Sequence, residues 1–99
     1  MPGMELTTTV AEDTATIVVA GEVDMANAPE LRDAIAAVAR QHPRTVVDLT
    51  ASKYFDSSGL RVLIAFADQL SEVVIPSTGI LARVFELAKL DEVVPLRRI

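Results

Sequence analysis

Residues 45–70 read TVVDLTASKYFDSSGLRVLIAFADQL, and this stretch decides the fold class. Its first five residues are mostly apolar or β-branched, a composition typical of a short strand in the middle of a sheet. From about Ser57 onward the apolar residues recur with helical spacing, so we expect a helix there. A buried strand that leads into an amphipathic helix is the repeating unit of α/β proteins.

The sequence before this stretch predicts an antiparallel hairpin. In residues 5–10, Glu5, Thr7 and Thr9 alternate with Leu6, Thr8 and Val10, as in a half-exposed strand. Residues 14–20 are rich in β-branched side chains and read as a second strand. Glu12-Asp13 forms the turn between them, and Gly21 is expected to end the second strand.

After the hairpin, helix and strand patterns alternate to the end of the chain. The expected elements are a helix from Asn27 to Pro43, a strand over 45–49, a helix from Ser57 to Leu70, a strand over 73–75, a helix from Ser77 or Thr78 to Leu90, and an edge strand over 93–96. Asn27 and Glu30 have the spacing of a capping box. The pattern predicts one α/β domain over residues 1–99, with a mixed sheet of four to five strands and helices packed on it.

Shared helical stripes and central strand positions predict the core. On the last helix, the apolar side is expected to contain Ile80, Val84, Leu87 and Ala88. The residues expected to be buried are Leu31, Ile35, Val38, Val47, Leu49, Leu63, Ile64 and Val84.

Composition excludes several classes of function. The net charge is −5 with nine Lys and Arg in 99 residues, so a broad basic face for nucleic acid or an anionic membrane is not available. There is no cysteine, which excludes disulfides, thiolate zinc sites and cysteine nucleophiles. No apolar run approaches the ~20 residues of a membrane span, and the start, Met1-Pro2-Gly3-Met4-Glu5, lacks the features of a signal peptide. We therefore expect a cytoplasmic location.

The chain also lacks the signatures of an enzyme. His42, the single histidine, stands beside Pro43 with no acidic partner near it in sequence, and no nucleophile elbow, Walker loop or GxGxxG is present. Glu22, Asp24 and Asp56 offer oxygen ligands that suit Mg²⁺, but such carboxylates more often cap helices and face water. We predict a protein that is not an enzyme, with no cofactor and no metal site.

The segment Asp56-Ser57-Ser58-Gly59 lies between the expected strand and the start of the expected helix, and it has two interpretations. Asp and Ser are preferred helix N-caps, and Gly59 suggests a close approach of the backbone, so an ordinary cap accounts for these residues. Alternatively, a serine hydroxyl is displayed for phosphorylation, since the positive end of a helix tolerates a phosphate.

Three segments in this order resemble the STAS domains of bacterial anti-sigma factor antagonists. They are Gly21-Glu22-Val23-Asp24, Val46-Val47-Asp48-Leu49 and Phe55-Asp56-Ser57-Ser58-Gly59-Leu60. The resemblance runs from about residue 5 to residue 96. It implies a domain whose unphosphorylated form binds an anti-sigma factor, often a serine kinase of the histidine-kinase-like ATPase type, and so frees a sigma factor. Phosphorylation ends the binding, and a PP2C-type phosphatase restores it.

Carried over by position, the resemblance makes Ser57 the phosphorylated residue. Asp56 and Ser58 flank it in the partner-binding surface, with Asp24 on the preceding loop, and Gly59 and Leu60 complete the motif. We expect Arg61, on the exposed side of the same helix, to lie beside that surface.

Two other functions stay open at this point. One is a STAS scaffold or subunit without the switch, in a stress-signalling or lipid-transport complex. The other is a small nucleotide hydrolase, against which the missing phosphate-binding loop argues. The chain also departs from the family in one place, since only Ser71-Glu72 separate the expected second helix from the strand after it.

Overall fold

The predicted N-terminal hairpin is confirmed in the computed structural model, which describes residues 3–99. β1 (Met4–Ala11) and β2 (Thr14–Val23) pair antiparallel without interruption, and Glu12 in the turn has a φ of 57°. β2 continues past Gly21 to Val23, although the strand was expected to end at Gly21. Gly21 has a φ of 90° beside a shift in the pairing of β2 with β3, so it bends the strand instead of ending it.

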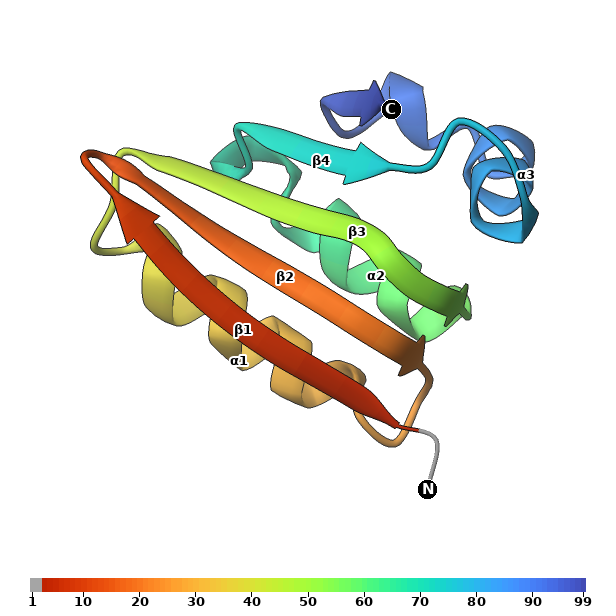
Figure 1. Cartoon of the computed structure of the whole chain (residues 1–99), viewed down its shortest axis with the longest axis horizontal. Helices are drawn as coiled ribbons and strands as arrows, with labels where there is room; N and C mark the ends of the chain where they lie inside the picture. Colours follow the sequence, from red (N-terminus) through yellow and green to blue (C-terminus); the bar gives the residue numbers. More distant parts are fainter. Residues whose placement is uncertain (1–2) are drawn as a thin grey trace.

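The other elements complete a mixed sheet with the strands in chain order. They are α1 (Ala28–Ala39), β3 (Arg44–Phe55), α2 (Ser57–Ala65), β4 (Glu72–Ile75), α3 (Ile80–Leu87) and β5 (Leu96–Arg98), with short 3-10 turns at Ala67–Gln69 and Leu90–Glu92. The order is β1-β2-β3-β4-β5, and β2 to β5 are parallel (Figure 1). The predicted mixed sheet of four to five strands is confirmed, and it has five strands.

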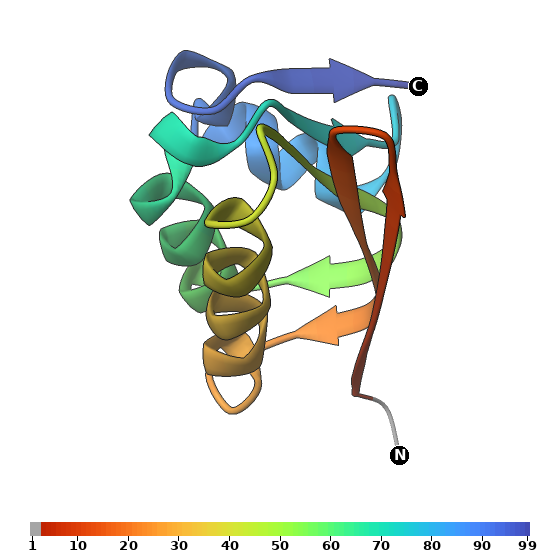
Figure 2. The ribbon, with the colours of Figure 1, turned by 90° about the vertical axis from the view of Figure 1, so that its left-hand side faces the viewer.

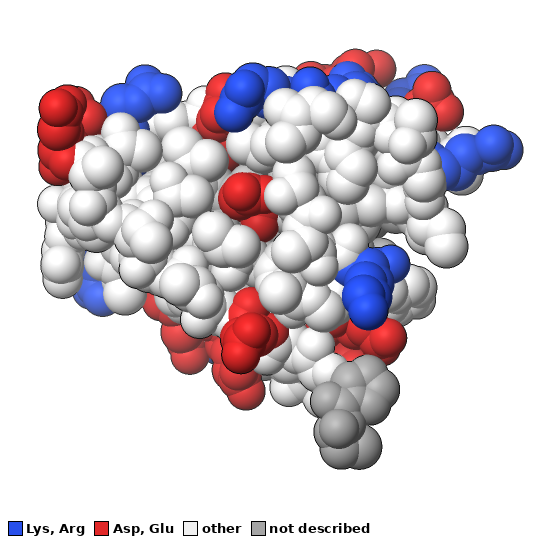
Figure 3. Space-filling model, in the orientation of Figure 1, with Lys and Arg blue, Asp and Glu red and all other residues white. Residues whose placement is uncertain are grey.

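All three helices cover the same face of the sheet (Figure 2). Each connects one parallel strand to the next strand in the same direction, and right-handed crossovers then place every helix on one side. The opposite face is open, and it is mostly uncharged, with an acidic group near its centre and most charges at its rim (Figure 3).

The core lies between the sheet and the helices. Leu31, Ile35, Val47, Leu49 and Leu63 are fully buried, as predicted. The largest buried side chains are Phe55 and Phe85, whose rings meet edge to face with centroids 5.9 Å apart. This contact joins the end of β3 to α3.

Three core assignments need correction. Val38 and Val84 are only partly buried, although both pack against the core. Ile64 is 46% exposed, because α2 turns Gly59, Val62 and Leu63 towards the sheet and so directs Ile64 outward.

The face predicted for the third helix was also wrong. Ile80 and Leu87 are 66% and 70% exposed, and Ala88 is exposed too. The buried residues of α3 are Leu81 and Phe85, which share a stripe four residues apart. Both stripes are apolar in sequence, and the contact with Phe55 selects the second.

Several predicted boundaries also differ from the structure. β3 extends to Phe55 instead of ending at Leu49, and the expected edge strand over 93–96 lies instead at Leu96–Arg98. α2 ends at Ala65, well before Leu70, and a 3-10 turn follows it. Because α2 ends early, the residues from Phe66 onward are available to connect it to β4, so no long loop is needed at Ser71-Glu72. The Ser71 N–H donates to the Thr45 carbonyl at 2.8 Å.

Within residues 3–99, none of the helices combines the length and apolar character that a membrane crossing requires.

The corrected core leads to a paired stability prediction. Val47→Ala removes methyl groups from a fully buried site and should lower the free energy of unfolding by about 1–4 kcal/mol. Ile64→Ala should lower it by less than about 1 kcal/mol, since Ile64 is largely solvated. Urea denaturation followed by circular dichroism measures both values. Equal losses would place Ile64 in the core after all.

Candidate functional site

The strands β2 and β3 end side by side, at the end of the sheet where the parallel strands have their carboxyl termini, which we call the carboxyl edge. Val23 pairs with Phe55, and the Asp56 N–H donates to the Val23 carbonyl at 3.1 Å. Asp24 and Asp56 therefore leave the sheet from adjacent strands. This carboxyl edge is where open α/β sheets present their functional loops.

Asp56 is the N-cap of α2. Its backbone is extended, and its Oδ1 accepts hydrogen bonds from the N–H groups of Ser58 at 2.8 Å and Gly59 at 3.4 Å. The Leu60 N–H donates to the Asp56 carbonyl at 3.2 Å. One aspartate thus satisfies three N–H groups in the first turn.

Ser57 is the first residue of α2, and it is exposed. Within the described residues, no side-chain hydrogen bond involves its hydroxyl group. The positive end of the helix lies behind that hydroxyl. The two best-placed N–H groups are already bonded to Asp56, so a phosphate on Ser57 would rely on the partial charge of the helix end and not on those donors.

Gly59 is buried against the ends of the two strands. A Cβ atom built on it would lie 2.6 Å from Cε2 of Phe55 and 2.9 Å from Cγ1 of Val23. Real Cβ atoms do not approach so closely, so the motif glycine is required for close packing of the helix on the sheet. This confirms the close backbone approach that the sequence suggested.

The loop after β2 is held by its own polar side chains. The Asp24 Oδ1 accepts from the N–H groups of Ala26 at 2.9 Å and Asn27 at 3.1 Å. Asn27 in return accepts from the Asp24 N–H and donates from Nδ2 to the Glu22 carbonyl, each at 2.9 Å. The predicted capping box of Asn27 with Glu30 is wrong, because the Asn27 side chain is used to close this loop. Asp24 is exposed and fixed in position.

The residues assigned to partner binding gather at this edge as one surface, which we call the carboxyl-edge patch. Its members are Asp24, Asp56, Ser57, Ser58, Gly59, Leu60 and Arg61. Arg61 is exposed one helical turn after Ser57, Ser58 and Leu60 are half-buried, and Gly59 contributes only through packing.

Exposed apolar residues border the patch, and the sequence analysis missed them. Met25 is 78% exposed beside Asp24, Tyr54 is 47% exposed two residues before Asp56, and Ile64 is one turn beyond Arg61. No local signal marks such residues, since each would also suit a core position. They give a largely polar surface an apolar component, which is common in protein interfaces.

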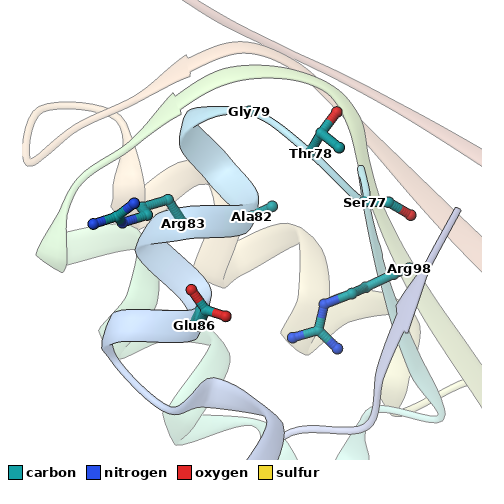
Figure 4. Close-up of a pocket in the computed structure, with 7 residues that line it drawn as sticks. All are labelled: Ser77, Thr78, Gly79, Ala82, Arg83, Glu86 and Arg98. Carbon is teal, nitrogen blue, oxygen red and sulfur yellow. The ribbon is translucent and has the colours of Figure 1, made fainter.

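Metal-ligating clusters and pockets are the other features that bear on binding. Among residues 3–99, no three His, Asp or Glu side chains come together in a way that could hold a metal ion. A shallow pocket of about 310 Å³ lies between α3 and β5, and none of its lining residues belongs to the carboxyl-edge patch. In Figure 4, Glu86 and Arg98 extend towards this space whereas Arg83 extends away from it. The Ser77 hydroxyl at its rim donates to the Ile99 carbonyl at 2.8 Å.

Comparison with known proteins gives consistent matches in sequence. A family model described as "Mlab, STAS domain" matches residues 6–96. The anti-sigma-F factor antagonist RsfB of Mycobacterium tuberculosis is 33% identical over 81 residues. That match covers 79% of this chain, and the chain spans 65% of the length of RsfB.

Solved structures share the fold. A crystal structure of an anti-sigma factor antagonist from Mycobacterium paratuberculosis is 32% identical, with a TM-score of 0.85 over 95% of this chain and 85% of that one. The Bacillus protein SpoIIAA in its phosphorylated form has a TM-score of 0.66 over 98% of this chain and 91% of that one. At 18% identity, the second likeness shows the fold alone.

The packing of Gly59 leads to a second stability prediction. Gly59→Ala adds a Cβ that clashes with Phe55, so it should lower the free energy of unfolding by about 1–3 kcal/mol although alanine is the better helix former. Ser58→Ala, one residue earlier, is the control and should change the value by less than about 0.5 kcal/mol. Thermal and urea unfolding give both numbers. A Gly59→Ala protein more stable than the parent would show that the helix does not sit this close to the sheet.

Proposed function

The chain belongs to the STAS domain family, and on this premise we propose that it is an anti-sigma factor antagonist. The names of RsfB and of the Mycobacterium paratuberculosis protein support this activity. In the proposed action, the unphosphorylated domain binds an anti-sigma factor through the carboxyl-edge patch and so releases a sigma factor. The activity is one of binding, without catalysis, and we place it in the cytoplasm.

The position of Ser57 carries the proposal that this binding is switched. Its hydroxyl is exposed at the start of α2, beside the carboxylate of Asp56, and the helix below it is packed and capped. A kinase can therefore reach the hydroxyl without opening the fold. We assign the modification to the anti-sigma factor itself, as a serine kinase of the histidine-kinase-like ATPase type, and its removal to a PP2C-type phosphatase.

Electrostatic repulsion explains why phosphorylation would weaken the binding instead of strengthening it. A phosphate adds about two negative charges next to Asp56 and near Asp24, on a surface that a partner must desolvate. Asp56 already uses the N–H groups of Ser58 and Gly59, so these donors cannot neutralise the phosphate. The new charge is left facing the partner, and binding fails while the domain stays folded.

A second candidate is a STAS scaffold or subunit that lacks the switch. One observation favours it: Asp56 and Gly59 have complete structural roles, as helix cap and as packing contact, without any phosphate. In that case the carboxyl-edge patch would bind its partner permanently. The behaviour of Ser57 separates the two candidates.

Substitutions at Ser57 test the switch. Ser57→Ala should bind the anti-sigma factor persistently and resist phosphorylation. Ser57→Asp should keep its unfolding free energy within about 1 kcal/mol of the parent but bind at least about tenfold more weakly, because it places a charge beside Asp56. Calorimetric titration with an anti-sigma factor recovered from native extract by pull-down measures the affinities, and mass spectrometry after incubation with ATP locates the phosphate.

Ser58→Ala is the matched control, since it removes a hydroxyl one residue away and should still be phosphorylated and released. Phosphate found on Ser58 or Thr50 would overturn the assignment to Ser57. Persistent binding with no phosphate on any residue would favour the scaffold.

Arg61 tests where the partner sits. Because Arg61 is exposed on the helix that begins at Ser57, Arg61→Glu should slow association by about 3–10-fold at low salt, with the difference shrinking as salt rises. Arg83→Glu makes the same charge change on the exposed side of α3 and should leave the rate nearly unchanged. Stopped-flow kinetics over a salt series provides the rates. Equal rates for the two variants would remove α2 from the interface.

A further inference from the structure

The two edges of the sheet differ in how they are protected. β5 has three residues, follows Pro95 and contains Arg97 and Arg98, all features that discourage pairing with another strand. β1 has eight residues, pairs with β2 without a bulge from Met4 to Ala11, and has Glu5 as its one charge. β1 is therefore a long and unprotected edge.

Alternate residues of β1 direct their backbone groups away from the sheet. The residues that flank a two-residue hairpin loop bond to each other, and the alternation then runs along the strand. The Glu22 N–H, which donates to the Gly3 carbonyl at 3.0 Å, keeps the same alternation at the far end. Leu6, Thr8 and Val10 thus present outward N–H and C=O groups. In Figure 2, no element of the described chain is drawn in front of β1.

Apart from Glu5, the side chains of this edge strand are apolar or uncharged. Val10 is 54% exposed, and Leu6 is only half-buried against the core. Thr7 and Thr9 are exposed and point to the opposite, open face of the sheet, since side chains alternate along a strand. Among residues 3–99, no strand pairs with the outer side of β1, and Val10 stays largely solvated.

We propose that β1 pairs antiparallel with β1 of a second copy of this chain, about a twofold axis through Thr8. The two sheets then become one continuous sheet, with the helices of both copies on the same side. The register places residues of compatible kinds opposite each other: Leu6 with Val10, Thr7 with Thr9, Thr8 with Thr8, and Glu5 with Ala11.

The sequence of the strand argues for a second copy as the occupant. A twofold interface requires a surface that complements itself, and Leu6-Thr7-Thr8-Thr9-Val10 has the same kinds of residue in both directions. Threonine pairs and aliphatic pairs are both favourable across antiparallel strands, and no like charges meet. This pairing does not rest on the proposed function, because it uses no residue of the carboxyl-edge patch.

Sedimentation of the full chain over a concentration series tests the dimer. The mass should rise from 10.6 kDa towards twice that value. Thr8→Pro removes an outward N–H from each copy and should raise the dissociation constant roughly 30-fold. Val10→Lys should also weaken the dimer, whereas Ile80→Lys, an equal change at an exposed aliphatic residue of α3, should not. Circular dichroism checks that each variant is folded. A mass of one chain up to about 1 mM would overturn the proposal.

Cysteine cross-linking tests the register, because the chain contains no cysteine of its own. In Thr8→Cys, the two new residues face each other with Cα atoms about 5.5 Å apart, within the range of a disulfide. In Thr7→Cys they are offset by two residues, about 8 Å apart and out of range. Thr8→Cys should therefore oxidise to a covalent dimer much faster than Thr7→Cys. An equal or reversed order would overturn the proposed register.

Discussion

The contact between the backbone of Gly59 and the ring of Phe55 is the constraint on which the carboxyl edge depends. Because nothing larger than a hydrogen atom fits there, the first turn of α2 lies directly on the ends of β2 and β3. Asp56 fixes the same junction from the polar side, with its N–H on the Val23 carbonyl and its carboxylate on the helix. The direction of α2, and with it the outward position of Ser57, follows from these two interactions.

The fold was predictable because its local signals agree with its tertiary arrangement. The β-branched hairpin and the alternation of strands with amphipathic helices predict a mixed sheet with helices packed on it. That all three helices lie on one face follows from the strand order, which no local signal sets. The predictions fail where the local sequence suits two arrangements equally well. The last helix has two apolar stripes, and only packing of Phe85 against Phe55 decides between them. Asn27 has the spacing for a capping box with Glu30, but it closes a loop with Asp24 instead.

In the candidate site, too, some features are determined by residues nearby in sequence and others by the tertiary arrangement. Asp56 as a cap and Gly59 as a close contact could be predicted, since Asp56 caps N–H groups two and three residues on and Gly59 meets Phe55 four residues before it, although Gly59 also meets the distant Val23. The apolar border of Met25, Tyr54 and Ile64 could not be predicted. The exposure of Ile64 depends on how α2 rotates on the sheet, and that of Met25 and Tyr54 depends on how a loop and the end of β3 are placed in the fold. The resulting surface combines carboxylates, hydroxyls and one guanidinium with apolar side chains held on a rigid base. Such a combination suits recognition of another protein better than chemistry on a small molecule.

The order of the strands in space equals their order in the chain, and this has a consequence for synthesis on the ribosome. Each strand pairs only with the strand before it and the strand after it, so the sheet can grow in the direction of translation without rearrangement. At every intermediate length the nascent domain ends in one open strand, first β2, then β3 and then β4. β5 is the last strand to emerge, and its proline and arginines make it a poor template for any further addition. Within this five-stranded sheet, β5 thus closes the edge that grows during synthesis.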